Sequence, residues 1–467
     1  MPCYWPKGSG HNYIFGSGLW IGAIDSMTCD TMVTIGYGTH GGECEFVPGL
    51  YGQDPNAPYV IIYMYPDPWP APIDSFPMAP QITNSDQDSW CCYNDCDSTN
   101  HMPNDTKPIG IEVYQTVCVW VDSLFADMAF LTFEIKNVHH KPIKNLYVGY
   151  CTDWDIGNES GPGANDICSA IVGKWYVVNG ESIWVDNLAF QWQIEDEPGW
   201  DDVGSIGIDL LQTPFDLQWG QDKDNDGILD QYERDSAYYV NNLPPVKWDV
   251  DNDRLFDWRD PSENPQLGMT AYKRFTLSLE PNKDNERYLT LAGYNFRTGQ
   301  YEPYDTIIPQ PDDQRFLVAS GPFELMPDSS VTVVLGIMLT YWDRNNHTIP
   351  DTEIVLLDHR LQSYYNTNWR LGVKEISSVN PEIQNFFIRP NPTRNWATVN
   401  FSLGKSNYVT LKLYNPLGQL VKNILDENKQ SGECSIRINT NGLASGTYFL
   451  LLQTGSEIKS RRLVIIN

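Results

Sequence analysis

The sequence predicts a mainly β protein, with one large or two packed β-sandwich domains plus one helix, followed by a small C-terminal immunoglobulin-like β-sandwich. Three observations lead to this fold class. Aromatic residues make up 13% of the 467 residues and accompany 35 glycines and 32 prolines, so strand formers alternate with turn formers. Short apolar-alternating runs recur up to about residue 345. A second set of alternating strands begins near residue 385.

The body of the protein is expected to span residues 1–372. Its apolar runs are short and are separated by Gly, Pro, Asn and Asp, which is the spacing of strands in a sandwich; examples are YVIIYMY, MAFLTFEIKNV and SVTVVLGIMLTYW. No window with the period of a helix is comparably strong before residue 345. We therefore expect the body to be built from strands almost throughout.

One segment of the body, at about residues 351–370, has a different period. Ile354, Leu357 and Leu361 recur at helical spacing, with a proline before the segment and a glycine after it. This pattern predicts a helix that covers the preceding sandwich, rather than a helix that binds a partner.

Charge excludes one class of function. The formal net charge is -29, whereas a nucleic-acid binder needs a basic stripe that releases phosphate counterions. No apolar run is long enough to span a bilayer. The chain opens MPCYWPKGSG, which is not a signal peptide. Either the protein is cytoplasmic, or this numbering starts after or inside a longer precursor.

Nine of the ten cysteines lie in the first 168 residues. In an exported protein, such clustering suggests disulfides. Cys29 and Cys44 bracket a hairpin-like stretch, and Cys151 and Cys168 bracket a Gly/Asn/Asp loop, so these two pairs are the predicted disulfides. The alternative is that several of these cysteines are buried free thiols.

A polar connector at residues 373–384 leads to the predicted C-terminal domain, residues 385–467. Its sequence motifs follow one another in this order: RPNP, ATVNFSL, LYNPLGQLV, GLASGTYFL and a basic group before a final apolar strand. This ordered set resembles the type A C-terminal sorting domain of type IX secretion. An ordinary immunoglobulin-like module would give similar strands, but it would not predict this position or the basic-then-apolar ending.

The resemblance implies an address rather than an activity. It implies that residues 385–467 interact with the type IX secretion machinery and that the protein is secreted or held at the outer surface of a Gram-negative cell. The body is similar to large secreted β proteins that carry the same tail, through GSGLWIGAI, LGMTAYKRF and FLVASGPFELMPDSS. That similarity does not indicate an activity.

The strongest chemical motif is the segment DKDNDGILDQYE, residues 222–233. It matches an EF-hand-type loop, in which carboxylates and one carbonyl surround Ca²⁺, and a glycine allows the sharp turn at position 6. The expected ligands are Asp222, Asp224, Asp226, Ile228 through its carbonyl, Asp230 and Glu233. No helices obviously flank the loop, so it resembles the thrombospondin-type calcium loops of extracellular modules.

A second such loop is DVDNDRLFDWRD, residues 249–260. Arginine replaces the glycine and a shorter aspartate replaces the final glutamate, so we expect a weaker site or one that shares an ion with the first loop. The expected ligands are Asp249, Asp251, Asp253, Leu255 through its carbonyl, Asp257 and Asp260. Calcium is the cofactor that both loops predict.

A third acidic feature is the pair Asp153 and Asp155 in YCTDWDIGN. Residues two apart point to one side of a strand, so the two carboxylates suit a metal site or a general acid/base pair. Turn chemistry is the alternative reading.

The sequence contains no HExxH, GxSxG, P-loop or Rossmann motif, and it identifies no catalytic residue. The first hypothesis is a secreted or cell-surface, calcium-stabilised structural or adhesive protein that self-assembles in a surface layer or filament. The alternative is a secreted carbohydrate-binding or carbohydrate-degrading protein, because exposed aromatic rings bind sugars and carboxylate pairs cleave glycosides. The expected further partners are therefore copies of itself or surface glycans.

Overall fold

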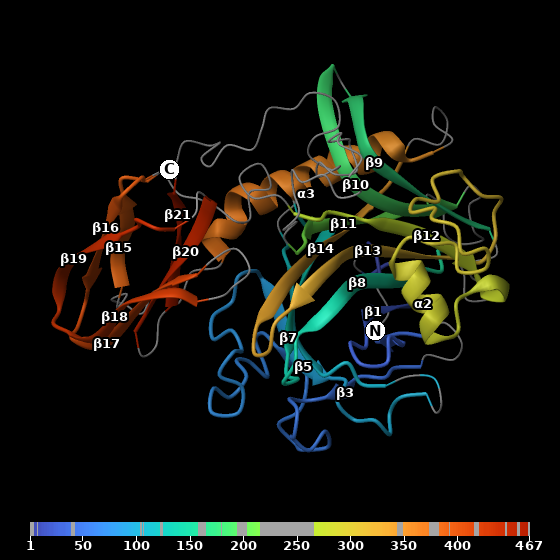
Figure 1. Ribbon diagram of the computed structural model, residues 1–467. Helices are drawn as coiled ribbons and strands as arrows, with labels where there is room; N and C mark the ends of the chain where they lie inside the picture. The colour runs from blue at the N-terminus through green and yellow to red at the C-terminus, as the bar shows by residue number, and fades with distance from the viewer. Residues whose placement is uncertain are drawn as a thin grey trace. The chain divides into compact units, whose positions relative to one another are not determined.

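The structure is a computed structural model of the chain, shown in Figure 1. It describes all residues except 1–3, 7, 39–42, 103–104, 106, 122–124, 157–164, 179, 194–202, 215–265, 343–348, 373–382, 392, 415–419, 444–445, 455–457 and 466–467. The chain divides into two compact units, Met1–Trp369 and Arg370–Asn467. Each unit is described separately below.

The larger unit contains a five-stranded antiparallel sheet. Its strands follow the order β12 (Ala271–Thr276), β13 (Gln314–Leu325), β8 (Ile143–Asp153), β1 (Gly16–Ile24) and β2 (Thr31–Ile35). The central strand β8 therefore pairs with β13 on one side and β1 on the other, although the three lie far apart in sequence.

The second sheet of this unit is larger and also antiparallel. Its strands follow the order β3 (Val47–Pro48), β5 (Gln87–Asn94), β6 (Ile111–Val119), β7 (Met128–Asn137), β14 (Ser330–Thr340), β11 (Ser205–Gln212), β10 (Glu181–Gln193) and β9 (Asp166–Val178), and β4 (Tyr63–Met64) pairs with β5.

The two sheets pack face to face around one core, so the larger unit is one sandwich and not two. Strand β14 has apolar residues on both of its faces, because both faces are buried. Val333, Leu335 and Ile337 point into the core between the sheets, whereas Val334 and Met338 belong to a second cluster on the outer face. A strand that is buried on both sides reads as a continuous apolar run.

Helix α3 (Asp351–Gly372) covers that outer face, as the sequence predicts. Two glycines of the sheet allow it to lie close. A Cβ on Gly336 would overlap the Leu361 side chain, and a Cβ on Gly207 would lie 3.0 Å from Ile354 Cδ1. The described apolar residues of the helix are therefore core residues, and the core-covering role is confirmed.

A second helix, α2 (Asp284–Leu291), covers the outer face of the five-stranded sheet and follows the short 3₁₀ turn η1 (Leu277–Leu279). The sequence prediction of a single helix is wrong on this point. The helix has only 8 residues, too few to show a helical period. It is held by Leu291, whose Cδ atoms occupy the space where Cβ atoms on Gly22 and Gly149 would lie.

The smaller unit is a sandwich of two antiparallel sheets. One has the order β15 (Ile383–Arg389), β16 (Trp396–Leu403) and β19 (Gly432–Asn439); the other has the order β18 (Leu420–Lys429), β17 (Asn407–Tyr414), β20 (Gly446–Gln453) and β21 (Ile458–Ile465). Both sheets contribute to one core, which contains Val399 and Phe401 from one sheet and Leu411 and Leu450 from the other. The predicted alternation of β16 and β17 is confirmed.

Neither described helix is long and apolar enough to cross a membrane.

Neither predicted disulfide is formed. Cys29, Cys44, Cys151 and Cys168 are free thiols in this structure. For the second pair the reason is topological: Cys151 lies in the cluster under α2, whereas Cys168 lies in the core between the sheets. Both thiols are fully buried, which is the alternative that the sequence left open.

Candidate functional site

Three carboxylates gather at one end of the five-stranded sheet. Asp153 is the last residue of β8, Asp155 lies two residues further on, and Asp313 immediately precedes β13. Each of the three offers a carboxylate oxygen that lies within 4.8 Å of the oxygens offered by the other two. The predicted pair is therefore close together, and the fold adds a third aspartate to it.

The strand pairing explains why these residues meet. Asp153 stands opposite Gly16 of β1 on one side and opposite Arg315 of β13 on the other. Trp154 is fully buried in the core between the sheets, and its Nε1 atom donates a hydrogen bond of 3.1 Å to Ser17 Oγ. The two aspartates thus flank a side chain that the core holds in place.

Asp153 is almost fully buried, with 1% of its surface exposed. The Tyr37 hydroxyl donates a 2.6 Å hydrogen bond to Asp153 Oδ2, and the Arg315 Nε atom lies 3.1 Å from the same oxygen. Only glycine fits at position 16, because a Cβ there would overlap the Tyr37 ring. The other oxygen, Asp153 Oδ1, is buried and has no hydrogen-bond partner among the residues that the structure describes.

Arg315 joins two of the carboxylates, since its Nη1 atom also lies 3.0 Å from Asp313 Oδ1. The guanidinium is itself buried, with 7% of the side chain exposed. Sequence reasoning missed Tyr37, Asp313 and Arg315. Nothing in the local pattern of any of them marks a site, because only the pairing of β8 with distant strands brings them to Asp153.

Burial and mutual repulsion shift the acidity of this cluster. Burial and, to a smaller extent, the nearby charges of Asp153 and Asp313 together raise the pKa of Asp155 to about 7, against the opposing effect of Arg315. Burial also raises the pKa of Asp153, although Tyr37 and Arg315 both oppose the shift. At neutral pH, Asp155 is therefore close to its midpoint of protonation.

A fourth acid lies beside the three. Asp166, at the start of β9, is fully buried, and burial raises its pKa well above the usual range. Its Oδ2 atom accepts hydrogen bonds from the Gln191 amide at 2.9 Å and from the Ile156 backbone at 3.3 Å. These donors hold the Asp166 side chain in the interior. We therefore treat Asp166 as a residue that supports the cluster and not as one of its three carboxylates.

The arrangement suits two kinds of chemistry. A negatively charged cluster that offers only oxygen ligands favours hard divalent cations such as Ca²⁺ over metals that prefer nitrogen or sulfur. Alternatively, a carboxyl group whose pKa lies near 7, beside ionised carboxylates, has the properties of a general acid or base.

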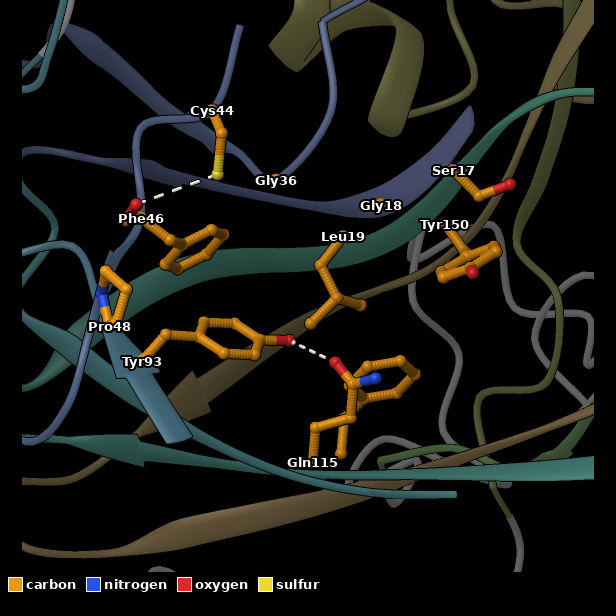
Figure 2. Close-up of a pocket in the computed structure, with 11 residues that line it drawn as sticks. Ser17, Gly18, Leu19, Gly36, Cys44, Phe46, Pro48, Tyr93, Gln115 and Tyr150 are labelled. Carbon is orange, nitrogen blue, oxygen red and sulfur yellow. Dashed lines mark hydrogen bonds between the residues drawn. The ribbon is translucent and has the colours of Figure 1, made fainter. Parts of the chain in front are cut away.

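A separate pocket, shown in Figure 2, opens between the two sheets with a volume of about 290 Å³. Inside it the Tyr93 hydroxyl donates a 3.0 Å hydrogen bond to Gln115 Oε1. Burial raises the pKa of the Cys44 thiol, so this cysteine is not an activated nucleophile. Acidic residues are absent from the lining, which consists of Ser17, Gly18, Leu19, Gly36, Cys44, Phe46, Pro48, Tyr93, Gln115, Phe133 and Tyr150.

Aromatic rings are exposed on the hairpin of β9 and β10. Trp175 and Trp184 face each other across the two strands with ring centroids 5.3 Å apart, and 47% of Trp175 is exposed. Such a surface suits stacking against planar or apolar faces of a ligand.

The two predicted calcium loops, residues 222–233 and 249–260, lie outside the described residues. Their ligand assignments therefore stay predictions.

Comparison with known proteins identifies the small unit. Residues 388–467 match the family described as the secretion system C-terminal sorting domain. This match agrees with the ordered motifs and with the compact sandwich that these residues form. The chain is thus an exported protein, addressed through its tail to the type IX secretion machinery and to the outside of a Gram-negative cell.

The comparisons do not identify the body. No curated protein matches the chain. Among solved structures, a polysaccharide lyase aligns with 99% of this chain and 44% of its own length, at 7% identity and a TM-score of 0.26. Dimeric latent PorU from Porphyromonas gingivalis aligns with 81% of this chain and 31% of its own length, at 9% identity and a TM-score of 0.16. The chain spans less than half of either protein, and similarity at this level carries no argument about activity.

Proposed function

We propose that this chain is an exported structural or adhesive protein of the cell surface, whose body is stabilised by calcium and packs with copies of itself. The observation that carries the proposal is the sorting domain at residues 388–467, which sends the body to a calcium-containing exterior. A structural role is supported by the packing of the body, in which α3 and α2 each add an apolar cluster on the outer face of a sheet.

The calcium part of the proposal rests on the two acidic loops. In loop 222–233, five carboxylates and the carbonyl of Ile228 fall at all the ligand positions of a Ca²⁺ loop. Melting the full chain with and without chelator tests it. We expect chelator to lower the melting temperature and Asp222→Ala to remove part of that effect. An unchanged melting temperature, together with unchanged bound calcium in Asp222→Ala, would refute this part.

Export and assembly need their own measurements. Deleting residues 385–467 should keep the protein out of the medium and off the cell surface, and unchanged secretion would contradict the assigned address. For the structural role, sedimentation of the full chain in calcium should show species larger than a monomer. A strictly monomeric protein that releases sugars from polysaccharide would instead support the alternative.

That alternative, a carbohydrate-binding or carbohydrate-degrading protein, is favoured by two features. Trp175 is an exposed ring that can stack on a sugar, and Asp155 has a pKa suited to acid–base catalysis. The carboxylates are absent from the lining of the 290 Å³ pocket, however, so that pocket does not bring a bound ligand to them. Reducing-sugar release that Asp155→Asn abolishes would establish this function in place of the structural one.

A further inference from the structure

The carboxylates at the end of the five-stranded sheet have the spacing that a calcium ion requires. Ca²⁺ binds oxygens at 2.3–2.6 Å, so ligands on opposite sides of the ion stand about 5 Å apart. The oxygens offered by Asp153, Asp155 and Asp313 all lie within 4.8 Å of one another. These separations are in the range that three ligands of one ion span.

A buried oxygen without a partner points to a ligand at this place. Asp153 has 1% of its surface exposed, and its Oδ2 atom is already used by Tyr37 and Arg315. Its Oδ1 atom is buried and accepts no hydrogen bond. A buried carboxylate oxygen is costly unless a donor or a cation satisfies it. Asp153 is one of the three clustered carboxylates, and the described part of the chain supplies no donor for this oxygen.

The charge of the cluster also suits a divalent ion. Within the described residues, the three carboxylates are accompanied by one guanidinium, that of Arg315, which contacts Asp153 and Asp313. With all three ionised, the group carries two uncompensated negative charges. One Ca²⁺ neutralises both, whereas a further hydrogen bond would leave them in place.

We infer that Asp153, Asp155 and Asp313 bind one Ca²⁺, which holds the end of β8 against the start of β13. The inference rests on the proposed function only for the presence of calcium outside the cell, and it places this ion outside the two acidic loops. Backbone carbonyls or water complete the six to eight oxygens that Ca²⁺ takes. The ion has a structural effect, because it joins two neighbouring strands where their pairing ends.

The test uses the full chain in a background without the loops, in which Asp222→Ala, Asp224→Ala, Asp249→Ala and Asp251→Ala are combined. Calcium alone is titrated into this background and followed by calorimetry after chelator has been removed. We expect one Ca²⁺ per chain and a higher melting temperature. Asp155→Asn and Asp313→Asn should each weaken binding by tenfold or more, since each removes one charged ligand but keeps the shape of the side chain.

The matched control is Asp312→Asn, which neutralises the exposed neighbour of Asp313 and should leave the affinity unchanged. Circular dichroism confirms that each variant is folded before binding is compared. Folded background protein that takes up no calcium, or calcium binding that Asp155→Asn and Asp313→Asn leave unchanged, would overturn the inference. Sugar-releasing activity that depends on Asp155 in calcium-free protein would also overturn it, in favour of catalysis.

The outcomes separate this inference from the proposed function. If the original chain binds calcium and the background does not, the loops bind the ion and only the site inferred here is rejected. If the background binds one ion and Asp155→Asn and Asp313→Asn weaken that binding, the site is supported whatever the loops do. If the original chain binds no calcium at all, both are rejected.

Discussion

Arg315 and Asp153 face each other across the β13–β8 ladder, and the guanidinium Nε atom lies 3.1 Å from the carboxylate Oδ2 atom. Both side chains are buried, with 7% and 1% exposed. In calcium-free buffer, Arg315→Met should lower the free energy of unfolding by about 3–5 kcal/mol, because it removes the cation that pairs with Asp153 and Asp313 in the described part of the chain. Urea unfolding measures the change.

The same two strands provide the control for this prediction. Lys144 of β8 and Glu324 of β13 form an ion pair of 3.2 Å whose side chains are 54% and 51% exposed. Lys144→Met should cost no more than about 1 kcal/mol, because water screens the pair. Equal costs for the two variants would show that burial does not set the strength of the Arg315 pair.

The close approach of α3 to the sheet predicts a strong effect at Gly336. Adding a Cβ there forces Leu361 out of its position, so Gly336→Ala should destabilise the body by about 1–3 kcal/mol. Combining it with Leu361→Val should recover part of the loss, because the smaller side chain makes room. A double-mutant cycle in urea measures the coupling, and purely additive effects would contradict the contact.

A pair of buried acids joins α3 to the sheet and predicts a pH effect. Asp358 of α3 and Asp209 of β11 are 3% and 1% exposed, and each affects the pKa of the other. Burial, with repulsion from neighbouring aspartates, raises the pKa of both well above the usual value. The stabilisation that these two buried carboxyl groups give the folded state is fully present below their unfolded-state pKa of about 4. It is lost as the pH rises through their raised folded-state pKa values.

Asp358→Asn removes one of these two titrations. The variant should match the original protein at about pH 4, where the carboxyl is protonated, and should become relatively more stable as the pH rises toward 8. Urea unfolding at both pH values, in chelator, gives the comparison. A stability difference that does not change with pH would mean that the pKa of Asp358 is not raised in the folded state.

The separate core of the tail predicts a local effect on export. Leu411 is fully buried in a cluster whose members all belong to the smaller unit. Leu411→Ala should destabilise that unit by about 2–5 kcal/mol and reduce secretion, while the melting of the body stays the same. Thr410→Ala on the same strand, at a half-buried position, is the control. A parallel loss of stability in the body would contradict two separate cores.

Local periodicity explains which elements the sequence predicts. The strands of the tail alternate with period 2 and the residues of α3 recur at helical spacing, so both can be identified from neighbouring residues alone. Helix α2 escapes prediction because its 8 residues bury little more than Tyr288 and Leu291 on their apolar side. The free state of Cys151 and Cys168 also escapes, since proximity in sequence does not show on which side of a sheet each lies.

The export of the protein, the β class of its body and the acidic pair at Asp153 and Asp155 can be predicted from residues that are adjacent in the chain. That Tyr37, Asp313 and Arg315 lie around this pair is seen in the folded protein alone. These three residues reach it through the pairing of β8 with β1 and β13 and through the glycine that admits the Tyr37 ring. Such long-range pairings are set by the packing of whole sheets, and no local pattern encodes them.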